Sequence, residues 1–330
     1  MRRLNPILIT LMILFFTDCA GKKEVKVLKL AHGLDISHPV HKGMEYMADL
    51  LAEKSGGKLT IEIYPSGQLG NERESLELLQ IGSLAITKVS ASVMENFAPN
   101  FKVLGLPYIF RNKEHMYGVL DGPIGQNLLI EGEDFRLRGL CYYDAGSRSF
   151  YTKDRPIESP TDLSGLKIRV MKSKTAMNMV EALGGSPTPI SFGELYSALQ
   201  QGVVDGAENN PPSFYFSRHY EVCKYYSLDE HTSVPDVLLI STEWWNALTD
   251  QQKKWLKEAA DESVIYQRKL WEESEAESLK AVQEAGVTIL RPDKSLFAEK
   301  AESVLEEYKD DPVKYELIKQ IKFQKDESNN

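Results

Sequence analysis

Cysteine is scarce in this 330-residue chain, which contains only Cys19, Cys141 and Cys223. Three cysteines cannot form the disulfide framework that stabilises many small secreted domains. Cys141 and Cys223 could form one disulfide in an oxidising compartment, but we expect both to be buried free thiols. The fold must therefore rest mainly on a hydrophobic core.

The chain also lacks an apolar run that could cross a membrane. The run from Pro6 to Phe16 falls short of the roughly 20 apolar residues that a bilayer core requires. Arg2 and Arg3 precede it and small residues follow it, which is the order of regions in an export signal. We therefore predict that residues 1–18 are a signal peptide and exclude them from the fold.

Cys19 stands where a bacterial lipoprotein carries its lipid-modified cysteine. Ala20 and Gly21 follow it, whereas Asp18 replaces the small residue that usually precedes the cysteine. We predict lipidation at Cys19, with simple cleavage nearby as the alternative. The protein is accordingly expected in the periplasm or elsewhere outside the cytoplasm, touching the membrane only through such an anchor.

Clusters of positive charge are missing as well. The 48 acidic residues outnumber the 39 Lys and Arg residues, which gives a formal net charge of −9. Nucleic acids and anionic membranes are therefore poor partners. The hydrophobic and charged fractions, 42% and 26%, are typical of soluble domains. The length provides core enough for two domains.

Motifs of catalysis and cofactor binding are absent from the sequence. It contains no G-x-S-x-G elbow, no Walker loop and no glycine-rich dinucleotide turn. His32, His38 and His41 lie close together but lack the spacing of a known zinc motif. Glu208 could act as a general base, yet nothing near it supplies an obvious nucleophile or second acid. We expect no enzymatic activity, no cofactor and no metal.

What the sequence does contain is an alternation of short apolar runs with longer helical stretches, which predicts an α/β protein. Asn71 can cap a helix that runs to about Ile81, with acidic residues in its favourable first turn. Strands are predicted at residues 25–31, 59–64, 84–90, 166–170 and 203–207. Further helices are predicted at residues 39–55, 173–183 and 192–201.

The later part of the chain decides how these units group. Pro187–Ile190 should be extended, but its two prolines restrict it to a sheet edge. Pro235–Ser241 is a predicted strand that could return to the first sheet. Asp250–Ala285 contains neither Pro nor Gly and would form a helix of roughly 50 Å, long enough to span both domains. A coiled-coil dimer is the less favoured alternative, because the apolar positions keep no heptad.

Six segments of the chain recur in recognisable form in a known family. They are LKLA (28–31), YPSGQLG (64–70), GSRSFYT (146–152), LKIRV (166–170), FGELYSALQ (192–200) and VDGAENNP (204–211). From about Val27 to its C-terminal helices, the chain resembles the DctP-type substrate-binding proteins of tripartite ATP-independent periplasmic (TRAP) transporters. The resemblance implies a periplasmic-binding-protein-like α/β fold, with two domains that are joined by hinge strands and a long helix and that close on a ligand.

The resemblance and the long helix together predict the domain boundaries. Residues 26–145 plus 235–275 would form domain I, and residues 146–234 plus 276–323 would form domain II. The ligand cleft would lie between them, with hinges near residues 145 and 235. We expect a monomer that delivers its ligand to the membrane subunits of a TRAP transporter.

The resemblance also implies how a ligand carboxylate is bound. The arginine of the family's Lys-Ile-Arg-Val strand forms a bidentate salt bridge with this group, and it corresponds to Arg169. Arg148 matches the family's second arginine, and Asn209 matches the asparagine of its Glu-Asn-Pro motif. Asn210 stands before Pro211 as a departure from that motif and could add a contact. A guanidinium suits the task because its planar fork pairs with both carboxylate oxygens.

Further candidate residues would bind hydroxyl groups of the ligand. Glu72 matches a family position at which a carboxylate can accept hydrogen bonds from two neighbouring hydroxyls. Lys88 and Ser90 lie two residues apart, so a strand would point both to the same side. A lysine on that side of an apolar strand predicts a polar ligand, with an exposed strand end as the alternative.

Three aromatic or imidazole side chains complete the candidate site. Phe192 matches a family aromatic residue that packs on the ligand, although core packing is equally consistent with the sequence. His38 and His41, at the start of the first predicted helix, could bind sugar hydroxyls. Helix capping or exposure to solvent is the alternative for both.

The predicted function is the capture of a sugar acid, with hexuronates such as glucuronate or galacturonate ahead of C4-dicarboxylates and sialic acid. A periplasmic enzyme that acts on a uronate through Glu72 or Glu208 is an alternative from another class. A ligand sensor that docks on a receptor kinase is a third.

Overall fold

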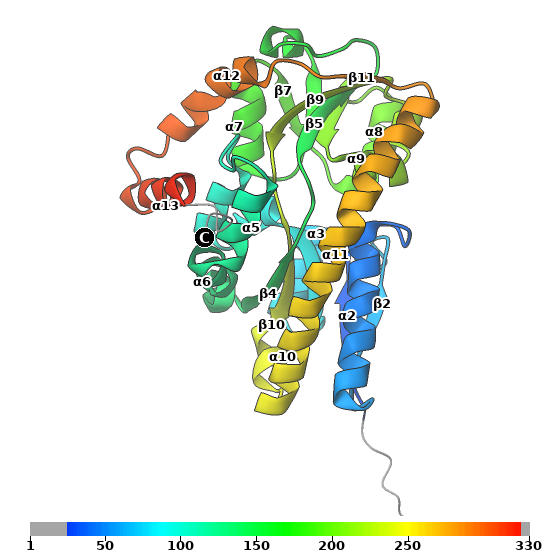
Figure 1. The fold of residues 1–330 in the computed structure, drawn as a ribbon, viewed down its shortest axis with the longest axis vertical. Helices are drawn as coiled ribbons and strands as arrows, with labels where there is room; N and C mark the ends of the chain where they lie inside the picture. The colour runs from blue at the N-terminus through cyan, green and yellow to red at the C-terminus, as the bar shows by residue number, and fades with distance from the viewer. Residues whose placement is uncertain (1–24, 325–330) are drawn as a thin grey trace, which may run out of the picture.

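The computed structural model of the protein describes residues 25–324, so the predicted signal peptide and Cys19 lie outside the described residues (Figure 1). The described strands form two separate sheets, with helices packed around each (Figure 1). We name the five-stranded sheet and its helices the first lobe, and the six-stranded sheet and its helices the second lobe. The α/β prediction is confirmed.

The sheet of the first lobe has the strand order β2-β1-β3-β10-β4. Its strands are β1 (Lys26–Ala31), β2 (Leu59–Tyr64), β3 (Ile86–Ser90), β4 (Leu137–Tyr143) and β10 (Asp236–Ser241). β1 pairs in parallel with β2 and β3, whereas β10 runs antiparallel to β3 and β4. The late strand thus returns to the first sheet, as predicted.

Helices of the first lobe cover both faces of this sheet. They are α2 (Pro39–Ser55), α3 (Glu72–Gln80), α4 (Ala91–Met94), η1 (Pro99–Gly105), α5 (Lys113–Asp121), α6 (Pro123–Glu131), η2 (Gly132–Phe135) and α10 (Thr242–Asn246). α2 has its predicted bounds because Pro39 occupies its first turn and Gly56 ends it with φ 59°. α3 begins at a capping box that Asn71 forms with Glu74.

The sheet of the second lobe has the strand order β11-β9-β5-β8-β6-β7. Its strands are β5 (Arg148–Thr152), β6 (Lys167–Val170), β7 (Ser186–Pro189), β8 (Gly206–Asn209), β9 (Tyr225–Thr232) and β11 (Thr288–Leu290). Its helices are η3 (Pro160–Leu163), α7 (Lys174–Ala182), η4 (Phe192–Glu194), α8 (Leu195–Gln200), α9 (Pro211–Phe216) and η5 (His219–Glu221). The proline-rich strand β7 lies at a sheet edge, as predicted. β8 begins later than the predicted 203–207, because a turn with Gly202 at φ 72° precedes it.

The long helix α11 (Asp250–Glu284) runs along both lobes (Figure 1). It packs against α2 and β4 of the first lobe and against α9 of the second. Its buried face includes Leu256, Gln267 and Trp271. Tyr266 on the same helix is 39% exposed, and its ring packs against that of Tyr46 at the surface.

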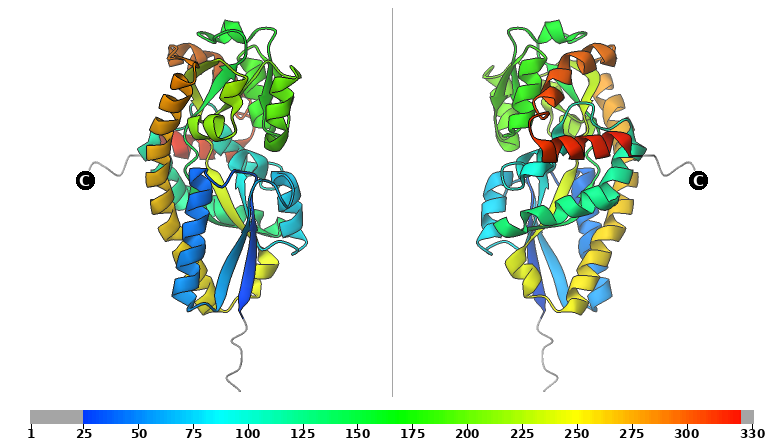
Figure 2. Two further views of the ribbon diagram at one scale, coloured as in Figure 1. Left: turned by 90° about the vertical axis from the view of Figure 1, so that its right-hand side faces the viewer. Right: turned by 90° about the vertical axis from the view of Figure 1, so that its left-hand side faces the viewer.

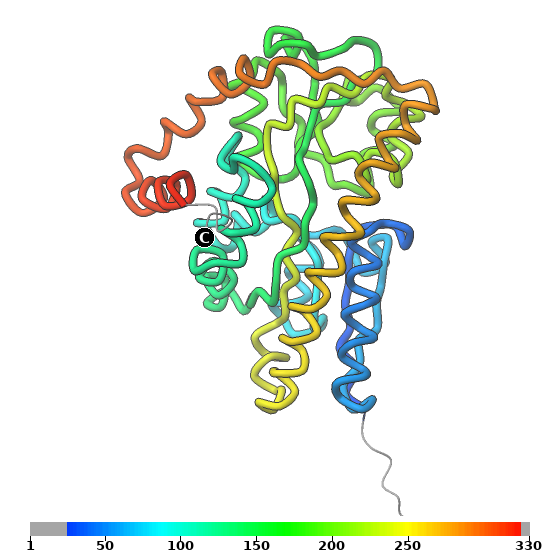
Figure 3. The backbone as a smooth tube through the Cα atoms, viewed as in Figure 1, coloured from blue at the N-terminus to red at the C-terminus, as the bar shows by residue number. Residues whose placement is uncertain are grey.

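Two chain segments join the lobes beside this helix. Residues 144–147 connect β4 to β5, and residues 233–235 connect β9 to β10 (Figure 3). The side chain of Gln267 in α11 bonds the backbone of Asp144 twice, accepting from its N–H at 2.9 Å and donating to its carbonyl oxygen at 2.8 Å. Both connections lie at the predicted hinge positions, while hinge motion itself stays a prediction.

The last two described helices diverge from each other. α12 (Lys294–Glu306) packs on α7 and β9 of the second lobe, whereas α13 (Pro312–Phe323) packs on η1 of the first (Figure 2). Ile318 and Ile321 of α13 are buried in the first lobe's core. This packing argues against placing residues 312–323 in domain II, because their apolar side chains are buried on domain I. The remaining domain boundaries stay a prediction.

Burial sets the state of the two later cysteines. Cys141 and Cys223 are both free and buried, as expected. Burial raises the pKa of each thiol above its usual value, which keeps both protonated and unreactive. Within residues 25–324, the helices are too short or too polar to span a lipid bilayer.

Candidate functional site

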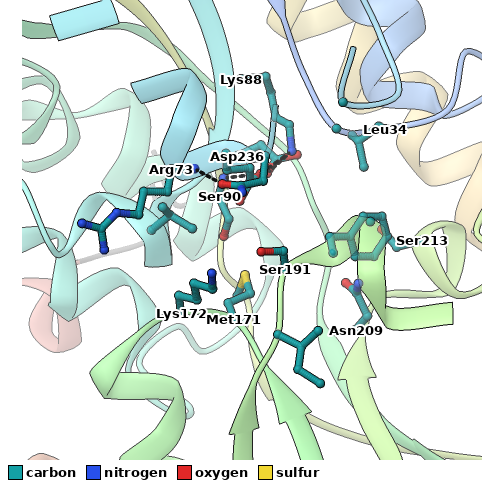
Figure 4. Close-up of a pocket in the computed structure, with 18 of the residues that line it drawn as sticks. Leu34, Arg73, Lys88, Ser90, Met171, Lys172, Ser191, Asn209, Ser213 and Asp236 are labelled. Carbon is teal, nitrogen blue, oxygen red and sulfur yellow. Dashed lines mark hydrogen bonds and ion pairs between the residues drawn. The ribbon is translucent and has the colours of Figure 1, made fainter. Parts of the chain in front are cut away.

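A cavity of about 420 Å³ lies between the two lobes and is lined by polar residues from both. Nine of the predicted site residues line it: Glu72, Lys88 and Ser90 with His38 from the first lobe, and Arg148, Arg169, Phe192, Asn209 and Asn210 from the second. Figure 4 shows labelled side chains of both lobes around this space, among them Lys88 and Asp236 of the first lobe and Ser191 and Asn209 of the second.

Arg169 lies on β6, which pairs in parallel with β7 and β8. The residue is only 2% exposed. Its Nε donates a hydrogen bond to the carbonyl oxygen of Ile190 at 2.8 Å. Its buried Nη1 finds no acceptor in the described part of the protein. Burial lowers the pKa of Arg169, although a guanidinium remains charged at any ordinary pH. The Phe192 ring centroid lies 5.9 Å from its Cζ, so the ring packs beside the cation.

Arg148, by contrast, is already bound within the protein. Its Nη2 donates to Oε1 of Glu208 at 2.9 Å, its Nε donates to Oε2 of the same carboxylate, and its Nη1 donates to Oδ1 of Asn209 at 2.8 Å. This bidentate pair fixes the plane of the guanidinium. Arg148 can therefore offer a ligand only what remains of its Nη1.

Glu208 lies behind Arg148 in a buried chain of charges. Its Oε2 is 3.6 Å from Nε2 of His231, whose Nδ1 is 2.8 Å from Oδ2 of Asp229. Burial opposes ionisation of Glu208, but the charges and hydrogen bonds of Arg148 and His231 together outweigh it and lower the pKa to about 2. Burial likewise opposes protonation of His231, but Asp229 and Glu208 raise its pKa to about 9. A carboxylate held in this way is a poor general base.

The two asparagines after Glu208 serve the backbone as well as the cavity. Oδ1 of Asn209 accepts from Arg148 and from the N–H of Asn210 at 2.9 Å, which leaves its amide nitrogen for other contacts. Oδ1 of Asn210 caps α9 by accepting from the N–H of Ser213 at 2.8 Å. The departure from the family motif at Asn210 thus has a structural explanation, the N-cap of α9.

The wall of the first lobe carries one lysine between two carboxylates. Nζ of Lys88 is 3.1 Å from Oε1 of Glu72 and 3.2 Å from Oδ1 of Asp236 (Figure 4). The N–H of Ser90 also donates to Oε1 of Glu72 at 3.1 Å. Burial raises the pKa of Asp236 to about 6, even though Lys88 opposes that shift. Lys88 and Ser90 face the same cavity, as the strand pattern predicted.

Of the two candidate histidines, only His38 lines the cavity. Nδ1 of His38 caps α2 by accepting from the N–H of Val40 at 3.3 Å, and Nε2 reaches Oγ of Ser213 in the second lobe at 3.3 Å. Burial lowers the pKa of His38 to about 3, so the ring is neutral. His41 does not line the cavity. Its ring instead contacts His32 at 2.9 Å and Glu45 at 3.2 Å.

Sequence reasoning missed several residues that line the cavity. They include Ser66, Arg73, Met171, Lys172, Ser191, Ser213 and Asp236. Asp236 carried a usable signal, because it is the one charged residue at the start of an otherwise apolar strand. The same signal, a charged residue on an otherwise apolar strand, identified Lys88. Among residues 25–324, no group of His, Cys, Asp and Glu is arranged to hold a metal ion.

Residues 30–311 match the family model described as bacterial extracellular solute-binding protein, family 7, named DctP. The chain belongs to the DctP family. It is 38% identical over 305 residues to YiiZ of Salmonella typhimurium, covering 91% of this chain and 92% of that protein. Members of the family are substrate-binding proteins of transporters rather than enzymes, and the resemblance found in the sequence is therefore confirmed.

Two crystal structures of TRAP periplasmic solute-binding proteins extend the comparison. One, from Bradyrhizobium in complex with galacturonate, is 40% identical with a TM-score of 0.89 and covers 91% of this chain and 100% of that one. The other, from Pseudomonas putida with bound glucuronate, is 36% identical with a TM-score of 0.87 and covers 91% and 97%. This chain has the two-lobed fold of these TRAP proteins and belongs to a periplasmic family.

Proposed function

We propose that this protein captures a hexuronate, either glucuronate or galacturonate, and delivers it to the membrane subunits of a TRAP transporter. The observation that carries the proposal is Arg169, a buried cation at the cavity whose Nη1 has no acceptor among the described residues. An unpaired buried guanidinium favours a planar anion that can accept two parallel hydrogen bonds. The hexuronates bound by two relatives supply such an anion.

In this proposal, Arg169 is the main anchor of the ligand carboxylate. Arg148 and Asn209 support it through the donors that remain free, Nη1 of the arginine and the amide nitrogen of the asparagine. The ring of Phe192 packs on the ligand. Asn210 contributes at most its amide nitrogen, since its oxygen caps a helix.

The opposite wall would bind the hydroxyl groups of the sugar. Carboxylates accept hydrogen bonds from hydroxyls, which favours Glu72 for this role and adds Asp236 to it. Lys88 and Ser90 hold these acceptors in place and can donate to a sugar oxygen. His38 would complete the wall with its neutral ring.

The first test of the proposal is calorimetric titration of the purified protein with D-glucuronate and D-galacturonate, and with glucose and galactose as neutral controls. We expect one or both acids to bind, and the neutral sugars to bind at least tens-fold more weakly because they leave Arg169 unpaired. Equal binding of acid and neutral sugar would contradict a carboxylate anchor. Conversion of a bound uronate to product would instead favour the enzyme alternative.

The proposal also includes a site of action outside the cytoplasm. Residues 1–18 would direct export, and Cys19 would carry a lipid that keeps the protein near its transporter. Domain closure about residues 145 and 235 would enclose the ligand and present both lobes to the membrane subunits.

A further inference from the structure

Three cations lie in the buried layer around the cavity, and only two of them have carboxylate partners. Lys88 is shared by Glu72 and Asp236, and Arg148 is paired with Glu208. Arg169 has no carboxylate partner within the described residues and keeps an unpaired Nη1. The second lobe therefore presents one unneutralised positive charge to the ligand.

The first lobe presents the opposite charge. Two carboxylates, Glu72 and Asp236, face a single ammonium group at 3.1 and 3.2 Å, so this wall carries one excess negative charge. The hydrogen bonds that these carboxylates accept within the described residues use Oε1 of Glu72 and Oδ1 of Asp236. Their second oxygens are available to hydroxyl donors, but a ligand anion at the same place would be repelled.

From this charge pattern we propose that Asp236, together with Glu72, makes the site selective for sugar acids with a single carboxylate and excludes diacids. The inference rests on the proposed function and narrows its substrate class. A ligand whose one carboxylate meets Arg169 places hydroxyls against the opposite wall. A second carboxylate would meet two like charges in a desolvated setting, which is an effective way to reject a wrong ligand.

Two other cations line the cavity but do not alter this balance. Lys172 and Arg73 are exposed to solvent, where charge interactions are screened. Arg73 is also paired with Glu77 at 3.1 Å. Neither can neutralise a second ligand carboxylate as a buried guanidinium would.

The test compares two open-chain acids that share six carbons and differ at one end. A hexonate ends in a hydroxymethyl group and a hexarate ends in a second carboxylate. Each is titrated calorimetrically in competition with a bound hexuronate, using wild type, Asp236→Asn and Glu72→Gln. The matched control is Asp261→Asn, since Asp261 also pairs with a lysine, Lys257, at 2.7 Å but lies on the exposed surface of α11.

We expect wild type and the control to bind the hexarate at least about tenfold more weakly than the hexonate. Asp236→Asn should improve relative binding of the hexarate by about tenfold, and Glu72→Gln provides the same comparison if the first variant does not fold. Equal binding of both acids by wild type overturns the inference. So does continued exclusion of the hexarate by a folded variant, because shape would then explain the exclusion. A wild type that binds no hexuronate contradicts the proposed function first, and with it this inference.

Discussion

Nε of Arg169 donates to the carbonyl oxygen of Ile190 at 2.8 Å, and this bond fixes the orientation of the guanidinium. The bond occupies the one N–H that a bidentate contact through both terminal nitrogens does not need. The terminal nitrogens therefore stay available for a carboxylate, in a position set by two neighbouring segments of the second lobe. An anchor that is already oriented loses less side-chain entropy when the ligand binds.

Replacing Arg169 with Ala should weaken hexuronate binding by tens-fold to thousands-fold, because loss of one partner of a desolvated charge pair costs on the order of 2–5 kcal/mol. Arg169→Lys should also lose affinity, since an ammonium keeps the charge but not the planar fork. Calorimetric titration measures both effects, and thermal unfolding checks that the variants fold. Normal affinity in a folded Arg169→Ala protein would show that the carboxylate is bound elsewhere.

Glu208→Gln should destabilise the protein by about 3–5 kcal/mol, because it leaves Arg148 buried without its counter-charge. The matched control is Glu77→Gln, which breaks an exposed arginine–glutamate pair and should cost less than about 1 kcal/mol. Urea denaturation gives the free energy of unfolding of each variant. Similar losses of unfolding free energy in the two variants would mean that the buried Arg148–Glu208 pair stabilises the fold no more than the exposed pair does.

His231 should make the stability of the protein depend on pH above neutrality. Its pKa is raised from 6.5 to about 9 in the folded state, so protonated His231 stabilises the fold fully below pH 6.5. That contribution, about 3 kcal/mol, should disappear as the pH rises through 9. We expect the free energy of unfolding of wild type to exceed that of His231→Gln by less at pH 9 than at pH 6. A difference that does not change with pH would contradict a charged His231.

Glu208 predicts the opposite behaviour in acid. Its pKa is lowered from 4.5 to about 2, so its ionised form stabilises the fold fully above pH 4.5. Stability should be lost as the pH falls from 4.5 towards 2. In Glu208→Gln this part of the acid dependence should be missing, as urea titrations at pH 5 and pH 3 can measure. An unchanged acid dependence in the variant would argue that other carboxylates cause it.

Ligand should shift the protein towards the closed arrangement, in which the lobes contact each other away from the hinges. Oε2 of Glu95 in the first lobe accepts from Oγ1 of Thr175 in α7 at 2.7 Å, a contact that opening would break. Small-angle scattering should therefore give a smaller radius of gyration with saturating hexuronate than without it. Arg169→Ala at the same ligand concentration is the control and should stay open. An unchanged radius in wild type, with ligand bound, would count against closure.

Export should produce a mature chain that begins at or just after Cys19. Protein made in a host that processes lipoproteins should carry a lipid on this cysteine and partition into detergent, and Cys19→Ala should not. Mass spectrometry of the two proteins decides between lipidation and simple cleavage. An intact Met1 on the exported protein would contradict both.

The sequence by itself determined most of the secondary structure and identified candidate residues on both walls of the site. Local signals fix these features: prolines and caps set the ends of α2 and α3, and an uninterrupted helical pattern set α11. Arg169 was found because it belongs to a short segment with its own recognisable pattern. Such features depend on residues that are close together in the sequence, so they can be predicted without the tertiary structure.

The tertiary structure alone decided which charges meet. Lys88 and Asp236 are 148 residues apart, and they touch because β10 pairs antiparallel with β3 and sets Asp236 opposite Ser90. Glu208 became the partner of Arg148 rather than a base because β8 lies beside β5. His41 lies outside the site because it belongs to α2 and its ring contacts His32 and Glu45, whereas His38 is the extended N-cap residue that precedes the helix. These pairings depend on strand register and on the packing of the lobes. Both are set by the burial of residues that are far apart in the sequence, so no local pattern predicts which charges meet.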